Sequence, residues 1–104
     1  MEQKQAIKIF EALASPIRLD IFRLLVQYNP DGLVAGDISS KLGIAPNNLS
    51  FHLKSLVYAS LIAAEQEGRF QRFRPDMAAM RGASDYILGE CCLHTKKCDK
   101  DEVC

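Results

Sequence analysis

The feature that most constrains the fold of this chain is the segment LVAGDISSKLGIAPNNLSFHLKSLVYASLI, residues 33–62. Ile38 and Leu42 have the i, i+4 spacing of a short helix, and Gly43 suits the left-handed residue that often follows a helix. Pro46 can open a second helix. The apolar residues of this second helix have the spacing of a buried stripe: Leu49, Leu53, Leu56 and Val57. Two short helices joined by three residues that include a glycine predict a helix-turn-helix.

A β-hairpin is predicted directly after the two helices. Residues 61–65 and 70–74 are strand-like and flank the turn sequence QEGR, residues 66–69. Phe70 and Phe73 fall on opposite faces of the second strand, so we expect one of them to close the hairpin onto the core. A helix-turn-helix followed at once by a basic hairpin has the element order of a winged helix.

Further helices are predicted on both sides of this unit. Residues 3–14 place apolar side chains at helical spacing: Ala6, Ile7, Phe10, Leu13 and Ala14. Ser15 and Pro16 suit the N-cap and the first position of the next helix, which ends at the turn sequence NPDG, residues 29–32. Residues 76–92 predict a last helix with one stripe: Met77, Met80, Ser84, Ile87, Leu88 and Cys91.

Together these elements predict a mainly α fold with a β-hairpin wing (α+β), a winged helix-turn-helix. A chain of 104 residues is of single-domain size, and we expect that domain over residues 1–92, with a flexible cysteine-containing tail over residues 93–104. No run approaches 18 consecutive apolar residues, and the N-terminus lacks the apolar core of a signal peptide. We therefore expect a cytoplasmic protein with no membrane partner.

The middle of the chain carries a basic excess. The whole chain has 13 basic and 13 acidic residues, which argues against a surface that is basic throughout. Residues 33–75 contain five basic and three acidic residues, which leaves a net charge of +2 there. That sign suits contact between this segment and an anionic partner.

Candidate DNA-binding residues lie on the second helix of the pair and on the hairpin. On the helix they are the positions away from the leucine stripe: Asn47, Asn48, Ser50, Phe51, His52 and Lys54. In a major groove, asparagine can pair with adenine, serine serves several base edges, and an aromatic ring can meet a thymine methyl group. Three hairpin arginines suit phosphate or minor-groove contacts: Arg69, Arg72 and Arg74. A polar helix face can also be merely solvated, but its combination with a basic hairpin favours DNA binding.

Three stretches resemble a known family: LASPIRLDIFRLL, DISSKLGIAPNNLSFHLKSLVYASLI and EGRFQRFRPD. With the L-S-x-H-L-K core of the second helix and the G-R-x-x-x-[YF] wing, they resemble the ArsR/SmtB family of metal-responsive bacterial repressors, over roughly residues 5–92. The resemblance implies a homodimer joined through the first and last helices, bound to a two-fold symmetric double-stranded operator and released by a metal. The apolar stripes of those two helices fit that expectation, because the chain has too little core of its own for them to cover. Such a dimer would place its two recognition helices one duplex turn apart.

Two sensor patterns of this family are missing from the chain. Many arsenic-sensing members carry cysteines in a C-V-C-D-L pattern at the start of the first helix of the pair, where this chain has Val34 and Gly36. The zinc-sensing carboxylate and histidine pattern of the last helix is missing too, because Asp85 and His94 lack partners. A metal site at His52 is not expected either, since no other histidine lies three or four residues away.

All four cysteines lie in the last fourteen residues: Cys91, Cys92, Cys98 and Cys104. A disulfide staple is excluded because residues 1–90 contain no cysteine to link. Soft ions select thiolates, and trivalent arsenic and antimony favour three of them. Adjacent cysteines in a helix point about 100° apart, but their sulfurs can converge if the helix frays after Gly89.

Some arsenic-responsive members resemble this chain in carrying a Cys-Cys pair with a third cysteine beyond the last helix. The resemblance therefore implies that Cys91, Cys92 and Cys98 bind As(III) or Sb(III) as the inducer, with no organic cofactor. Cys104 has no matching role, and His94 is expected to be solvated.

Other functions remain open. The same cysteines suit cadmium, lead or zinc, or a redox switch in which Cys91 or Cys92 closes on Cys98. The cluster could also have no function, or the chain could be a thiol-rich metal-binding module that binds no DNA. An enzyme lacks support, because a redox catalyst usually shows C-x-x-C at a helix N-terminus and these cysteines follow a helix. A transcriptional repressor is the leading hypothesis.

Overall fold

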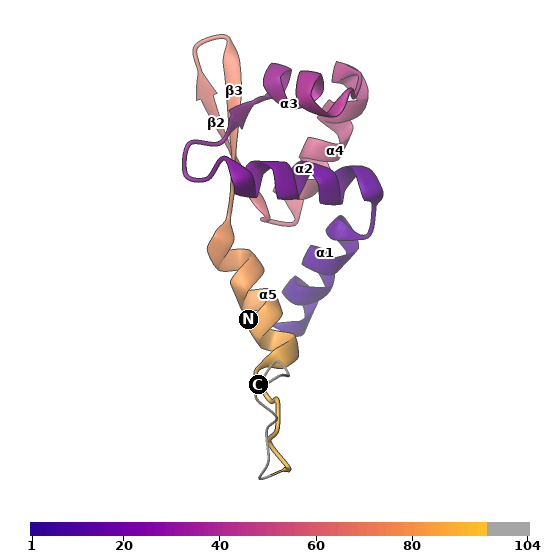
Figure 1. The fold of residues 1–104 in the computed structure, drawn as a ribbon, viewed down its shortest axis with the longest axis vertical. Helices are drawn as coiled ribbons and strands as arrows, with labels where there is room; N and C mark the ends of the chain where they lie inside the picture. The colour runs from indigo at the N-terminus through magenta and orange to yellow at the C-terminus, as the bar shows by residue number, and fades with distance from the viewer. Residues whose placement is uncertain (96–104) are drawn as a thin grey trace.

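The structure is a computed structural model that describes residues 1–95. Figure 1 shows the helix-turn-helix and the sheet at one end of the molecule, with the first and last helices side by side at the other. The elements follow in the order α1 (Gln3–Leu13), α2 (Pro16–Gln27), β1 (Leu33–Val34), α3 (Ala35–Leu42), α4 (Pro46–Tyr58), β2 (Ile62–Glu67), β3 (Phe70–Pro75) and α5 (Met77–Leu88). The predicted winged helix-turn-helix fold is confirmed. The predicted tail lies outside the described residues from residue 96 onward.

Two helix ends form as the local sequence predicts, and a side chain caps a third. The Ser15 hydroxyl accepts a hydrogen bond from the Arg18 backbone N–H at 3.4 Å, and Pro16 opens α2. Gly43 follows α3 with φ of 66°, in the left-handed region that glycine favours. Asp76 caps α5 by accepting from the Ala79 N–H at 3.0 Å. Short-range contacts and backbone preferences therefore fix these three helix ends.

The sheet differs from the predicted hairpin in two ways. It has a third strand, β1, and its antiparallel strand order is β1-β3-β2, with Leu33 opposite Phe73. Strand β2 also extends two residues closer to the turn than predicted, to Glu67, which pairs with Phe70 at the predicted start of β3. The turn is therefore the two residues Gly68 and Arg69, and Gly68 has φ of 60°.

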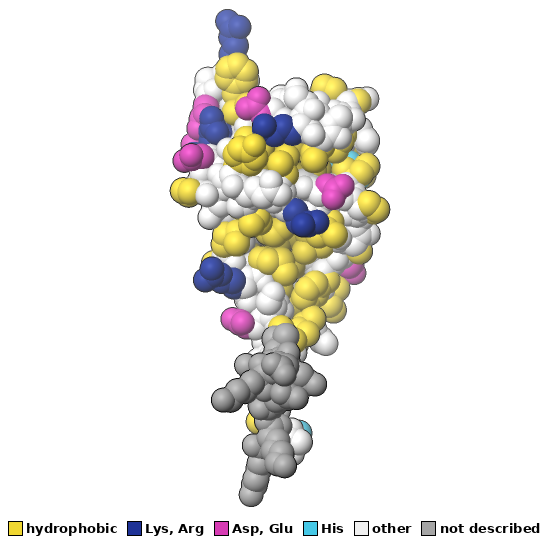
Figure 2. Space-filling model, in the orientation of Figure 1, with side chains coloured by type: hydrophobic (Ala, Val, Ile, Leu, Met, Phe, Trp, Pro, Cys, Tyr) yellow, Lys and Arg dark blue, Asp and Glu magenta, His cyan; other side chains and the backbone are white. Residues whose placement is uncertain are grey.

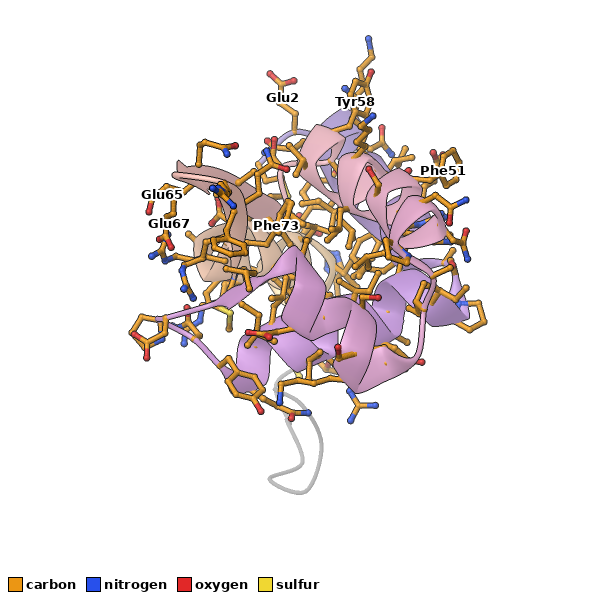
Figure 3. The ribbon with its side chains drawn as sticks, turned by 90° about the horizontal axis from the view of Figure 1, so that it is seen from above. Glu2, Phe51, Tyr58, Glu65, Glu67 and Phe73 are labelled. Atoms are coloured by element: carbon orange, nitrogen blue, oxygen red, sulfur yellow. The ribbon has the colours of Figure 1, made fainter. Side chains whose placement is uncertain are left out.

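The core lies between the sheet and helices α1 to α4. Its fully buried large side chains come from all of these helices and from the segment before β2: Ile9, Ile21, Leu25, Ile38, Leu49, Leu56 and Leu61. Phe73 is 4% exposed and Phe70 is 62% exposed, so Phe73 closes the hairpin onto the core. In Figure 3 Phe73 lies between the sheet and the helices.

The terminal helices leave part of their predicted apolar stripes uncovered, in agreement with the expectation that the chain's own core is too small to cover them. In α1, Ile9 is buried while Ile7 remains 48% exposed. In α5 only Ala83 is buried, and Ile87 is 61% exposed. The last helix also ends at Leu88, four residues before the predicted end at residue 92, and turns follow it. Within the described chain, a large apolar surface on α1 and α5 is thus left uncovered.

Gly32 is a position where only glycine fits. Its φ is 72°, and a Cβ atom added there would collide with the Phe73 carbonyl oxygen of β3. Gly36 differs, since it lies in α3 and a Cβ atom added there would meet no atom within 4 Å.

We expect Gly32→Ala to lower the free energy of unfolding by about 2 kcal/mol or more, through the left-handed backbone and the collision with β3. Gly36→Ala is the matched control and should raise it by about 0.5 kcal/mol, because alanine favours helix. Urea unfolding followed by circular dichroism measures both. Equal effects of the two substitutions would contradict the tight approach of Gly32 to β3.

Candidate nucleic-acid interface and thiol pair

The outward face of α4 is set by the burial of its leucines. Leu49, Leu53 and Leu56 are all buried against the core. The predicted DNA-contacting residues on the other side of the helix are exposed, except for His52: Asn47, Asn48, Ser50, Phe51 and Lys54. Phe51 is 65% exposed, and Figure 3 shows it on the outer side of α4. The structure therefore brings amide, hydroxyl, ammonium and aromatic groups together on one accessible helix face.

His52 is the member of the predicted set that turns inward. It is half-buried, and its Nδ1 atom lies 3.4 Å from Arg18 Nη1. Arg18 also donates a hydrogen bond from Nε to the Ala12 carbonyl at 2.6 Å. The Phe51 and His52 rings meet edge to face, with centroids 5.4 Å apart. His52 thus helps to hold α4 against α1 and α2.

The role of Arg18 was not predicted from the sequence. Arg18 and His52 are 34 residues apart, and no local pattern links them. The only sequence signal is that both fall within the stretches that resemble the family.

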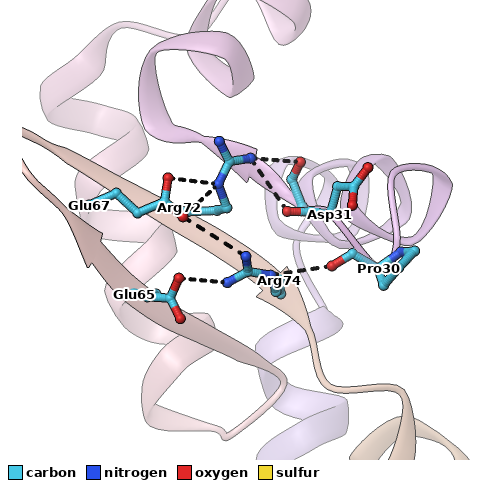
Figure 4. A network of polar contacts seen from close by, with 7 residues as sticks. Pro30, Asp31, Glu65, Glu67, Arg72 and Arg74 are labelled. Carbon is cyan, nitrogen blue, oxygen red and sulfur yellow. Dashed lines mark hydrogen bonds and ion pairs between the residues drawn. The ribbon is translucent and has the colours of Figure 1, made fainter.

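Two of the three wing arginines have protein partners. Figure 4 shows Arg72 donating from Nε to both carboxylate oxygens of Glu67, each at 3.0 Å. The Nη1 group of Arg72 also reaches the carbonyls of Asp31 and Gly32, each at 3.4 Å. Arg72 therefore ties the wing to the loop between α2 and β1.

Arg74 braces the same loop from the next outward position of β3. Its Nε donates to the Pro30 carbonyl at 3.2 Å, and its Nη1 lies 3.2 Å from a Glu65 carboxylate oxygen. Its Nη2 is 3.9 Å from Glu67. Arg69, by contrast, is exposed in the hairpin turn. The structure gives Arg72 and Arg74 a bracing role, while DNA contact by all three arginines stays a prediction.

The arginines also change the acidity of Glu67. The hydrogen bond from Arg72 lowers the pKa of Glu67 below its ordinary value, and the charges of Arg72 and Arg74 act in the same direction. Desolvation opposes them but does not reverse the shift. The ionised carboxylate is thus part of the brace.

A hollow of about 700 Å³ separates α4 from the wing. Apolar side chains line much of it, among them Leu53, Val57 and Phe73, and Lys54 and Gln71 also line it. The outward face of α4 and the hairpin therefore form two ridges with a depression between them. Two such ridges can enter different parts of the surface of a double helix.

The second candidate site follows α5. Cys91 and Cys92 lie in turns after Leu88, and their Sγ atoms are 3.2 Å apart. Cys92 has φ of 66°, so the chain has left helical geometry at this residue. The prediction that the two sulfurs converge where the helix ends is confirmed. Cys98 and Cys104 lie outside the described residues.

The two thiols influence each other. The hydrogen bond with Cys91 raises the pKa of Cys92, and desolvation and the charge of Cys91 add to the shift. Among residues 1–95 there is no group of three His, Cys, Asp or Glu side chains placed to hold a metal ion. The described part of the chain thus supplies two convergent sulfur atoms, and a third thiolate would have to come from beyond it.

Comparison with known proteins places these features in a family. The model of a family described as a helix-turn-helix domain matches residues 13–64, from the end of α1 into β2. An uncharacterized HTH-type transcriptional regulator of Bacillus subtilis, YbzH, is 26% identical, and the match covers 83% of this chain and 98% of that protein.

No helix within residues 1–95 has the length and hydropathy needed to cross a membrane.

Solved structures share the fold. An ArsR family transcriptional regulator, RHA00566, superposes with a TM-score of 0.77 at 16% identity, covering 94% of this chain and 98% of that one. The homodimeric winged helix-turn-helix DNA-binding domain of Mb0332 from Mycobacterium bovis, a possible ArsR-family regulator, gives a TM-score of 0.68 at 24% identity. This second match covers 92% of this chain and 89% of that one. Both likenesses confirm the winged helix-turn-helix fold.

The wing brace predicts a pH-dependent effect of Glu67→Gln. A carboxylate with a lowered pKa in the folded protein stabilises the fold above its unfolded-state pKa, and this contribution is lost as the pH falls through the folded-state pKa. We therefore expect Glu67→Gln to lower the thermal midpoint at neutral pH and to match the wild type in acid. Differential scanning calorimetry across that range measures the difference. The exposed Glu2, changed to Gln, is the control, and an equal loss there at neutral pH would contradict the brace.

Proposed function

We propose that this chain, which belongs to the helix-turn-helix domain family matched by residues 13–64, is a homodimeric transcriptional repressor that trivalent arsenic or antimony releases from its operator. The observation that carries the proposal is the outward face of α4. Its leucines are buried, and the opposite side presents an exposed row of base-reading side chains beside a braced wing.

On this proposal α4 enters the major groove of the operator. Asn47 and Asn48 in its first turn would read adenine edges, and Phe51 would meet a thymine methyl group. Lys54 and Arg69 would contact phosphates and so set the register of the protein on the duplex. Because Arg72 and Arg74 already hold the wing in place, their main contribution to DNA binding would be to keep Arg69 in position.

The uncovered apolar surface of the terminal helices supports a homodimer. Exposed large apolar side chains gather on α1 and α5: Ile7, Tyr86, Ile87 and Leu88. Figure 2 shows hydrophobic side chains collected over the end of the molecule that these two helices form. A patch of this kind marks an interaction surface, and a second copy would bury it across a two-fold axis. The solved structure of the related Mb0332 domain is homodimeric.

The thiol pair suits a soft trivalent ion. The sulfurs of Cys91 and Cys92 already converge to 3.2 Å, and Cys98 would supply the third thiolate. Trivalent arsenic is the neutral As(OH)3 near neutral pH, so each As–S bond that forms would break one As–OH bond, and the thiol proton would leave with the hydroxide as water. The pair directly follows α5, so ligation there would act on the helix that also carries the dimer surface.

The dimer surface gives one prediction. We expect Ile87→Glu to weaken the dimer by at least about tenfold, because a carboxylate would be buried at an apolar interface. Leu19→Glu is the control, since Leu19 is an exposed apolar residue of α2 and lies outside the proposed surface. Sedimentation equilibrium measures both dissociation constants. A wild-type monomer at micromolar concentration, or equal effects of the two changes, would refute this interface.

The sensor gives another prediction. Fluorescence anisotropy with a selected palindromic duplex should show tight binding by the wild type and dissociation on addition of As(III) or Sb(III). Cys91→Ser combined with Cys92→Ser should bind DNA normally but no longer dissociate. Cys104→Ser should respond like the wild type.

Parallel titrations with Cd(II), Pb(II), Zn(II) and peroxide separate the other soft-ion and redox functions. If the double serine variant still leaves the duplex on As(III) addition, the thiol pair is not the sensor. If the wild type shows no salt-dependent binding to any duplex, the repressor function itself fails.

A further inference from the structure

A second hollow, of about 560 Å³, lies between α1 and the later part of α4. Three basic side chains line it, one from each of three helices: Lys8 of α1, Arg18 of α2 and Lys54 of α4. Glu11 is the acidic residue among its lining side chains, and two aromatic residues, Phe51 and Tyr58, complete the wall. The hollow is therefore a basic surface with aromatic walls.

Two of the three basic groups, Lys8 and Arg18, are held in place by contacts within the protein. Lys8 Nζ lies 4.9 Å from the centre of the Tyr58 ring, which is a cation–π distance. Arg18 is fixed by its bonds to the Ala12 carbonyl and to His52. Tyr58 is 76% exposed, and Figure 3 shows it with Phe51 on the outer side of α4. Holding these groups in advance lowers the entropy lost when an anion binds.

We propose that this hollow seats a stretch of the operator's sugar-phosphate backbone, so that the DNA interface continues from α4 onto α1. The inference rests on the proposed DNA-binding function. Two observations favour DNA as the occupant. The hollow is continuous with the outward face of α4, because Phe51 and Lys54 belong to both. Its three cations against one carboxylate also complement a polyanion.

A second copy of the chain fits this surface less well. The apolar side chains suited to a dimer are Ile7 on α1 and Tyr86, Ile87 and Leu88 on α5, and none of them lines the hollow. Lys8 follows Ile7 directly, and successive residues of a helix point about 100° apart. Helix α1 can therefore present Ile7 to a second copy and Lys8 to DNA at the same time.

The test is the salt dependence of binding to a selected operator and to an unrelated duplex. Each phosphate contact contributes about 0.9 to the slope of log K against log salt concentration, so Lys8→Gln should reduce the slope of a dimer by about 2. Because phosphates carry no sequence information, both duplexes should lose affinity to the same extent. Lys8→Arg keeps the charge and should restore the slope.

Lys41→Gln is the matched control. Lys41 also lies over a tyrosine ring, 5.2 Å from the centre of Tyr28, but it lines neither hollow. It should therefore leave the slope unchanged.

The outcomes separate the two proposals. If the wild type binds no duplex in a salt-dependent way, the proposed function fails. If the wild type binds and Lys8→Gln has the same salt-dependence slope as Lys41→Gln, the proposed DNA-backbone site is refuted while the repressor function stands. If Lys8→Gln loses the dimer in sedimentation but keeps the salt-dependence slope of the wild type, the hollow contacts a second copy. That result would also refute the proposed DNA-backbone site. Circular dichroism of each variant, together with recovery in Lys8→Arg, distinguishes loss of charge from misfolding.

Discussion

The burial of Leu49, Leu53 and Leu56 is the constraint on which the rest of the structure depends. Removing a buried leucine side chain typically costs about 2–5 kcal/mol, so these three residues together fix the rotation of α4 about its own axis. A turn of one residue, about 100°, would bury Ser50 and Lys54 and expose the leucines. The core therefore decides which side chains α4 offers to a partner. The buried leucines leave a partner only limited freedom to reorient the helix.

The wing is positioned by a different kind of interaction. It is held by the third strand, by the close approach of Gly32 to Phe73, and by the bonds of Arg72 and Arg74 to the preceding loop. Arg72 and Arg74 form ion pairs with Glu65 and Glu67. The wing has three arginines and these two carboxylates, so its net charge is +1. The electrostatic attraction of the hairpin for DNA is thus weaker than a count of its arginines suggests, and its contribution is concentrated at Arg69.

The sequence predicted those parts of the fold that depend on neighbouring residues. The cap at Ser15, the left-handed Gly43 and the leucine spacing of α4 all act within one or two helical turns. Strand β1 was missed because it has two residues and forms only by pairing with β3, about forty positions later. For the same reason the partners of Arg18 and Arg74 could not be predicted, whereas the convergence of Cys91 and Cys92 could, because it depends only on where α5 ends.

Helix α1 connects the two proposed sites. It packs against α5, which leads into the thiol pair, and against α4, and it places Lys8 over Tyr58. For an inducer to release the operator, it must bind more tightly to an arrangement that fits DNA poorly, and coupling of this kind is typically about 1–3 kcal/mol. A three-thiolate site would fix the segment after Leu88 and so favour one position of α5 against α1. If Lys8 contacts the DNA backbone, a shift of α1 moves a phosphate contact in each subunit. The inducer then needs no direct effect on α4, whose rotation the leucines hold fixed.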